Sequence, residues 1–403
     1  MNASLSPSWL TRQRLVAYAV MLAATWLLVA VYIEYQARPD GGAPMITDFN
    51  TFYAISLLMR EIPVVNAFDG ATMHAYELTA AQAAYGGTLS AKDLAAIPLF
   101  PWMYPPLILP LLAPLALLPY ALAKLALTLP SLALFLLAAR RILPDGKLAV
   151  LVALAFPTTL LTLVFGQTGF LIGGLFGLGL TSLERRPWLA GLCFGLMTVK
   201  PHLGLLIPLA LVLGGHWRAI AAAALTLAGL AIVTLVLWGV APWQAFLGGA
   251  GVPLHLMETR SVPWTLMPTA YAGLRLAGAS TGLAYAAQGL AVLVAVAGVA
   301  WAWRRPGPLP LRAAVLVLAS TLANPFEYVY DLPVLALALL WLGRHLASRR
   351  PRAWEMTALA CLFATPLAAP GLASAVAVQP AALAILAGLG VALNRLRGQR
   401  TDL

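Results

Sequence analysis

Charged side chains are scarce in this 403-residue chain, and their scarcity decides its class. Asp, Glu, Lys and Arg make up 10% of the sequence, whereas hydrophobic residues make up 61%. A soluble globular domain carries about 25% charged residues, so the composition excludes one and predicts an integral membrane protein. Apolar runs long enough to span a bilayer recur from Leu15 to Leu393. We therefore expect a single all-α, polytopic membrane domain over residues 1–403.

Cysteine, nucleic-acid-type basic patches and metal-ligand clusters are also lacking. The two cysteines, Cys193 and Cys361, lie within apolar segments, which argues against disulfides and cysteine-ligated metals. The net charge of +11 comes from short turns without interleaved aromatic residues, so we expect no nucleic-acid partner. The five histidines show no metal-ligand spacing. We predict no metal site and no cofactor, while a requirement for a divalent cation stays open.

Proline, by contrast, is abundant at 30 residues, many of them inside hydrophobic stretches. Such breaks are tolerated at membrane depth only where they are buried in protein or line a cavity. The sequence therefore predicts short, broken helices around a cavity.

The basic residues orient the chain when they are placed on the cytoplasmic side. The first helix is predicted over residues 15–34 and is too long for the core of a signal peptide, so we expect it to be retained. Residues 35–102 then form a large periplasmic loop, residues 103–393 hold the remaining helices, and residues 394–403 form a cytoplasmic tail. The acidic residues played no part in this assignment, yet ten of the 14 fall on the outer side.

The spacing of apolar runs and turns predicts eleven to thirteen spans. Residues 104–118 either cross the membrane or dip into it. The arms flanking Lys200-Pro201-His202 hold about twelve residues each, or about 18 Å of helix, less than the hydrocarbon thickness of about 30 Å. We therefore expect this tip to lie in a recess below the outer surface. The other helices are expected over residues 148–165, 169–183, 219–240, 281–303, 310–323, 329–343, 353–368 and 375–393.

Ionisable groups at membrane depth are costly and so are functional candidates. Thr47 or Asp48 can be the N-cap of a helix over residues 49–60. Alternatively, Asp48 can be a general base that takes a proton from an attacking hydroxyl. Lys200 can be a snorkelling lysine or a cation that faces a phosphate. His202 can be a structural polar group or a ligand of substrate.

The remaining candidates also have two interpretations each. Gln167, in Gly166-Gln167-Thr168-Gly169, is a polar turn when read alone. Glu327 and Asp331 lie one helical turn apart, and Asp331 could simply begin a helix. Tyr104, before two prolines, is a rigid corner or a substrate contact. Two further outer-side cations could meet phosphate or form ordinary loop salt bridges: Arg60 and Arg260.

Taken together, the order of these motifs resembles glycosyltransferase family 87 of the GT-C superfamily. The likeness covers roughly residues 15–343 and rests on Asp48-Phe49 with Phe52-Tyr53, Tyr104-Pro105-Pro106-Leu107, Gly166-Gln167, Ala190-Gly191 with Lys200-Pro201, Trp217-Arg218, and Asn324-Pro325 with Tyr330-Asp331-Leu332. A more distant similarity is to the mannosyltransferase of glycolipid-anchor assembly. Relatives carry Gln-Ser after the residue equivalent to Met267, where this chain has Pro268-Thr269.

The resemblance implies an enzyme that takes a sugar from a polyprenyl-phosphate carrier and transfers it to a glycan or glycolipid acceptor on the periplasmic face of the bacterial inner membrane. It implies mannose as the expected hexose, Asp48 as the base and Lys200 as the group facing the lipid phosphate, with Arg60 and Arg260 as possible helpers. Gln167 and Asp331 match motifs expected to contact substrate. We place His202, Tyr104 and Glu327 with them as candidates.

Two other classes stay open from the sequence. A transporter or flippase of lipid-linked sugars also suits many broken helices, but transporters usually carry inverted repeats and polar residues at the midplane. Here the polar residues gather at the outer tips and no repeat is evident, which favours an enzyme. An inactive structural subunit is the third possibility.

Overall fold

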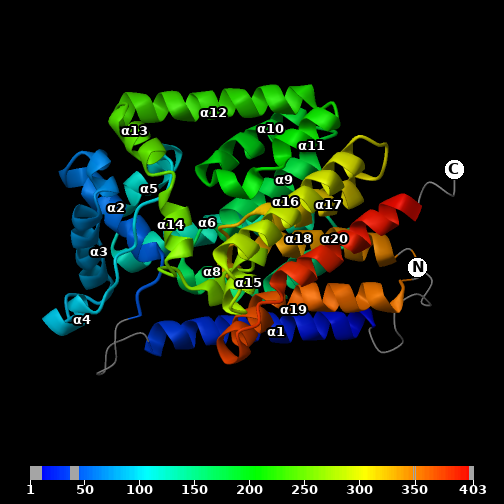
Figure 1. Ribbon diagram of the computed structural model, residues 1–403, viewed down its shortest axis with the longest axis horizontal. Helices are drawn as coiled ribbons and strands as arrows, with labels where there is room; N and C mark the ends of the chain where they lie inside the picture. Colours follow the sequence, from blue (N-terminus) through cyan, green and yellow to red (C-terminus); the bar gives the residue numbers. More distant parts are fainter. Residues whose placement is uncertain (1–10, 37–44, 348, 350, 399–403) are drawn as a thin grey trace.

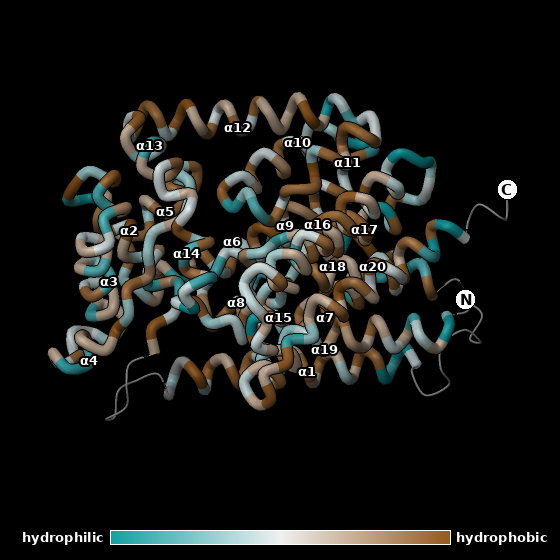
Figure 2. The backbone as a smooth tube through the Cα atoms, viewed as in Figure 1, coloured by the Kyte–Doolittle hydropathy of each residue, from teal (hydrophilic) through white to brown (hydrophobic). Residues whose placement is uncertain are grey.

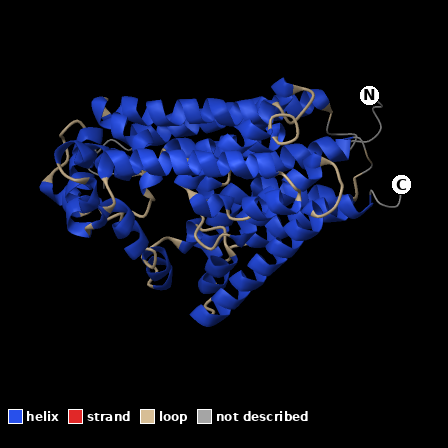
Figure 3. Ribbon diagram, turned by 90° about the horizontal axis from the view of Figure 1, so that it is seen from above, coloured by secondary structure: helices blue, strands red, loops and turns tan. Residues whose placement is uncertain are grey.

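The structure, a computed structural model, describes residues 11–36, 45–347, 349 and 351–398. Within these ranges every regular element is a helix and there is no strand, as Figure 3 shows. The predicted all-α fold is confirmed. Asp40 in the first outer loop and the tail beyond Gly398 lie outside the described residues.

Among the described residues, six helices are long and apolar enough to cross a membrane. A seventh candidate is a bent pair, in which α7 (Gly146–Ala155) and α8 (Thr158–Phe165) meet at an angle of 64° and form either one broken span or a re-entrant loop. The chain is thus a multi-pass membrane protein. The six are α1 (Arg12–Gln36), α6 (Tyr120–Arg140), α12 (Trp217–Trp238), α16 (Thr281–Trp303), α19 (Ala353–Val376) and α20 (Ala381–Gly398).

Shorter apolar helices complete the bundle, and the predicted eleven to thirteen spans are reached only if the bent pair and four to six of these shorter helices are counted. They are the run Pro106–Leu117, made of η2 (Pro106–Ile108), α5 (Leu109–Leu112) and η3 (Ala113–Leu117); α9 (Gly169–Ser182); α10 (Pro187–Leu196) with η4 (Met197–Val199); η5 (Pro201–Gly204) with α11 (Ile207–Leu213); α17 (Leu309–Ala323); and α18 (Pro333–Ala347).

Proline accounts for the helix boundaries that differ from expectation. The helix predicted over residues 329–343 begins at Pro333 instead, because proline suits the first turn of a helix, and residues Val329–Asp331 form a separate turn, η7. The helix predicted to end at residue 368 continues to Val376 through Pro366 and Pro370. Neighbouring helices in a membrane protein can satisfy the backbone groups that such prolines release.

The outer loops fold into short helices of their own. The first contains α2 (Phe49–Glu61), η1 (Val64–Phe68), α3 (Gly70–Ala84) and α4 (Ala91–Ala95). The second contains α13 (Ala241–Gly248), α14 (Val252–Glu258), η6 (Trp264–Leu266) and α15 (Ala270–Leu276). In Figure 1, α2 to α4 and α13 lie at the left end of the molecule, and both chain termini lie at the right.

The turns predicted to be cytoplasmic meet at the end that holds the termini. Arg12 forms an ion pair with Asp145 at 2.5 Å, and the Arg344 side chain donates to the Ile142 carbonyl at 2.8 Å. The right-hand ends of α1 and α20 are correspondingly hydrophilic in Figure 2.

Helix α9 sets the spacing of the bundle near the site because of its glycines. A Cβ on Gly174 would lie 2.8 Å from the backbone nitrogen of Phe135 on α6. Small residues of this kind let membrane helices approach closely. The close contact between α6 and α9 holds the N-terminal tip of α9, which begins just after Gln167, at the centre of the outer end.

Candidate functional site

A cavity of about 1210 Å³ opens among the outer tips. Its ionisable and amide groups come from loops and helix breaks, and an apolar part of its wall comes from α13, α14 and the segment 261–266. The polar lining residues are Asp48, Thr51, Tyr104, Gln167, Lys200, His202, Ser261, Tyr328, Tyr330 and Asp331. Six of the predicted site residues are therefore brought to one space.

Asp48 immediately precedes α2, but its carboxylate does not cap that helix. The residue has helical backbone angles (φ −59°, ψ −22°) and makes no side-chain capping hydrogen bond. One carboxylate oxygen, Oδ2, is buried and accepts no hydrogen bond. Since capping does not occupy the carboxylate, it is free to act within the cavity.

Two glycines explain why these distant segments meet. Gly166 ends α8 in the left-handed conformation (φ 64°), and a Cβ there would lie 2.6 Å from the Cβ of Phe49. A Cβ on Gly169 would lie 2.1 Å from the Tyr330 carbonyl oxygen, which also accepts the Thr162 hydroxyl at 2.9 Å. Only glycine leaves room for these approaches. Gln167 is thus held between the start of α2 and the turn η7.

Lys200 lies at the break between η4 and η5 and is 4% exposed. Its Nζ donates to Asp331 Oδ1 at 2.5 Å. The same ammonium lies 5.9 Å from the ring centre of Tyr104 and 5.5 Å from that of Tyr330. The other oxygen of Asp331 accepts no hydrogen bond, so the ion pair is incomplete on the carboxylate side.

Gln167 connects the corner at Tyr104 to Asp48. Its Oε1 accepts from the Tyr104 hydroxyl at 3.2 Å and from the Thr168 backbone at 3.1 Å. Burial raises the pKa of Asp48 above its ordinary value, although hydrogen bonding from the Tyr330 and Gln167 side chains and the charge of Lys200 act to lower it. A carboxylate with a raised pKa inside a cavity suits a base.

Glu327 lies behind the cavity and does not line it. The residue is 1% exposed, and neither of its carboxylate oxygens accepts a hydrogen bond. Burial, followed by the charge of Asp331, raises the pKa of Glu327 well above its ordinary value. This direction favours the protonated form of Glu327, and it is Asp331 that pairs with Lys200.

Arg60 and Arg260 lie outside the lining of the cavity. Both are exposed; Arg60 donates to the Ala116 carbonyl at 3.0 Å, and the Arg260 guanidinium stacks 5.1 Å from the Trp264 ring. The departure at Pro268-Thr269 also falls outside it, since the Thr269 side chain caps α15. The structure thus separates the two arginines from the residues that meet in the cavity.

Sequence reasoning missed the aromatic walls of the cavity. Tyr328 and Tyr330 stack with ring centres 5.1 Å apart and planes 13° apart, and Trp102 packs against Tyr104 at 5.2 Å. Tyr104 was a predicted candidate, and of the other three only Tyr330 carried a signal, because it belongs to the motif Tyr330-Asp331-Leu332. Among the described residues, no group of three His, Cys, Asp or Glu side chains is arranged to hold a metal ion.

Comparison with known proteins identifies one family. A model of glycosyltransferase family 87 matches residues 102–325, which is more than half of the chain. The matched range contains Tyr104, Gln167 and Lys200, whereas Asp48 precedes it and Asp331 follows it. No curated protein and no solved structure matches the chain.

Proposed function

Since the chain belongs to glycosyltransferase family 87, we propose that it transfers a hexose, with mannose as the first expectation, from a polyprenyl-phosphate carrier to a glycan or glycolipid acceptor. The reaction takes place on the periplasmic face of the bacterial inner membrane. The observation that carries this proposal is that Asp48 and Lys200 line the same cavity. The Asp48 carboxylate has one oxygen without a hydrogen-bond partner, and Lys200 is a buried cation.

The wall of the cavity supports a lipid-linked sugar as donor. Its volume of about 1210 Å³ exceeds the 300–1,000 Å³ that is typical of pockets for small molecules. The apolar residues of α13 and α14 suit a prenyl chain, and the aromatic walls suit the faces of sugar rings. Phe246, Val252 and Leu256 are examples of the apolar lining.

The proposed mechanism is a single displacement. Asp48 takes the proton from the acceptor hydroxyl, and the acceptor oxygen attacks the anomeric carbon. The bond from that carbon to the phosphate oxygen breaks, the electron pair leaves with the polyprenyl phosphate, and the anomeric configuration inverts. Lys200 offers the N–H groups that Asp331 does not use to the departing phosphate, whose growing charge it offsets.

The test is transfer by purified protein supplied with polyprenyl-phosphate sugars and candidate acceptors. Release of polyprenyl phosphate together with a glycosylated acceptor supports the proposal. Movement of the carrier between vesicle leaflets without its release would identify a flippase instead. Asp48→Asn should lower the rate by about 10²–10⁴-fold, the usual loss for a general base.

Asp69→Asn is the matched control in the same outer loop. Asp69 is the N-cap of α3, where its Oδ2 accepts from Thr72 N at 2.8 Å, and asparagine caps helices equally well. This variant should retain transfer. Near-normal turnover by Asp48→Asn would exclude Asp48 as the base.

A further inference from the structure

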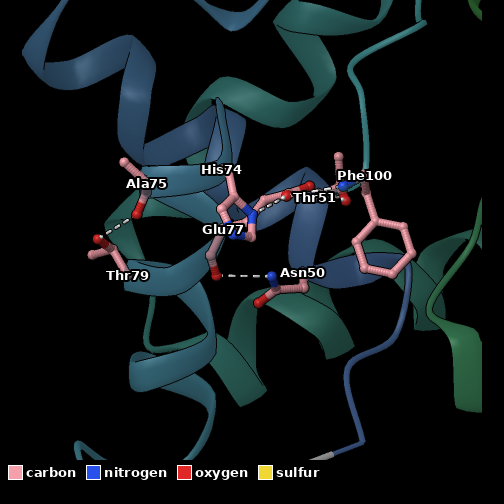
Figure 4. A network of polar contacts seen from close by, with 7 residues as sticks. All are labelled: Asn50, Thr51, His74, Ala75, Glu77, Thr79 and Phe100. Atoms are coloured by element: carbon pink, nitrogen blue, oxygen red, sulfur yellow. Dashed lines mark hydrogen bonds and ion pairs between the residues drawn. The ribbon is translucent and has the colours of Figure 1, made fainter. Parts of the chain in front are cut away.

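A second polar cluster lies behind the cavity and is centred on Glu77 of α3. The residue is completely buried, and its carboxylate is the meeting point of three elements, shown in Figure 4. Oε1 accepts from the Thr51 hydroxyl at 3.0 Å, and Oε2 accepts from the Phe100 backbone nitrogen at 3.1 Å. His74 Nδ1 lies 3.4 Å from Oε2.

The partners of Glu77 belong to two walls of the cavity. Thr51 lines it from the first turn of α2, and Phe100 lines it from the extended segment before Tyr104. The Asn50 side chain also donates to the Glu77 carbonyl at 2.9 Å, and Thr51 N donates to the Asp48 carbonyl at 3.2 Å. One carboxylate therefore connects the turn that presents Asp48 with the facing wall.

Stability of the loop alone does not account for this carboxylate. Of the neighbouring acids, Asp69 is exposed and caps α3, and Asp93 is partly exposed and completes the capping box that Ser90 begins at α4. Glu77, by contrast, is within α3 and caps nothing. A buried charge is costly to desolvate, and an apolar side chain in the same space is often at least as stable. What an apolar residue cannot do is accept hydrogen bonds from two walls at once.

We propose that Glu77 is a positioning residue for the transfer reaction, which holds the Asp48 turn of α2 and the Phe100 segment at a fixed separation across the cavity. This inference rests on the proposed function of the cavity. Glu77 itself does not line the cavity and has no contact with substrate in this role.

Two substitutions separate geometry from charge. Glu77→Gln retains the connection, because its Oε1 can accept from Phe100 N while its Nε2 donates to the Thr51 oxygen, a hydroxyl that can reverse its role. Burial raises the pKa of Glu77, so a neutral group suits the site electrostatically. Glu77→Leu has a similar volume and makes neither bond.

We expect Glu77→Leu to lower kcat by about a hundredfold, the loss that follows a misplacement of about 1 Å, with a smaller change in KM for the donor. Glu77→Gln should remain within about fivefold of the wild type, because the net loss is at most about one hydrogen bond. Thr51→Val should lose part of the activity, and Thr51→Ser should restore it. Rates are measured per folded molecule.

Hydrogen exchange of the detergent-purified protein without substrate provides a readout that is independent of transfer. Glu77→Leu should increase exchange in peptides over residues 45–55 and 96–104, and Glu77→Gln should not. Wild-type kcat per folded molecule in Glu77→Leu, or unchanged exchange in both peptides, would overturn the inference. Equal damage by Gln and Leu would also overturn it, since charge would then be the requirement. Absence of transfer by the wild type would count against the proposed function. Hydrogen exchange would still test whether Glu77 holds the Asp48 turn and the Phe100 segment in place.

Discussion

Two ion pairs, each with a buried carboxylate, lie at opposite ends of this molecule and differ in how many of their hydrogen-bonding groups have a partner. Near the termini, Arg395 of α20 holds Glu355 of α19 through both carboxylate oxygens, with Nε to Oε1 at 2.6 Å. The Arg352 backbone nitrogen also donates to Glu355 at 2.7 Å. At the outer end, Lys200 contacts one oxygen of Asp331, and the other oxygen has no partner.

The difference separates a structural pair from a site. Desolvation of a buried pair is offset only when its hydrogen bonds are complete, and the pair of Arg395 and Glu355 meets that condition. The pair of Lys200 and Asp331 does not meet it, yet it borders a cavity with a further free carboxylate oxygen on Asp48. Unsatisfied, buried charge beside an open space is typical of a place where a substrate completes the hydrogen bonds.

Of the two ion pairs, the outer one should have the larger effect on transfer. Lys200→Met should lower the transfer rate by about 10²–10³-fold, because it removes the charge that faces the departing phosphate. Donor titrations with the purified variant measure the loss. Lys200→Arg is the control, since it keeps the charge; it should recover part of the rate. A fully active Lys200→Met would show that both ion pairs are structural.

The pair of Arg395 and Glu355 should affect the stability of the fold instead of the transfer rate. Arg395→Met leaves Glu355 buried without its ion partner, so the free energy of unfolding should fall by about 3–5 kcal/mol. The thermal midpoint in detergent measures this change. Transfer per folded molecule should equal that of the wild type. A loss of transfer at permissive temperature would contradict the division between the two ends.

The fold was largely predictable from the sequence because hydropathy and basic turns determine membrane crossings. Lys200 and Asp331 could be placed on the same side in this way, but their contact could not, since 131 residues separate them. That contact depends on Gly169, whose missing Cβ lets Tyr330 approach. Glu77 gave no sequence signal, because its partners include the backbone nitrogen of Phe100.

A smaller effect is expected from pH. Burial raises the pKa of Asp48 above the ordinary value of 3.8, and a base acts only when it is deprotonated. The rate should therefore fall as the pH decreases through the raised pKa, which lies on the neutral side of 3.8. The pH profile of kcat/KM measures this limb. Lys200→Arg should show the same fall in rate at low pH. A fall whose midpoint lies at or below pH 3.8 would contradict the burial of Asp48.

The smallest effect is expected at Arg260. Its guanidinium is exposed and stacks on Trp264 outside the cavity lining. An ion pair between exposed charges contributes only about 0.2–1 kcal/mol of interaction free energy. Arg260→Ala should therefore change KM for the donor by no more than about fivefold. Arg60→Ala should behave alike. A loss as large as that of Lys200→Met would place the donor phosphate at the rim.

The close approach of Gly169 to Tyr330 also means that the site forms late during synthesis of the chain. Lys200 emerges from the ribosome 131 residues before Asp331. At about 5–20 residues per second, this lysine stays without its carboxylate for roughly 7 to 26 s. Over that interval α1 to α10 are already made, but the Tyr330 backbone that packs against Gly169 is not. A chain that stops before η7 would therefore insert most of its helices and still lack a site.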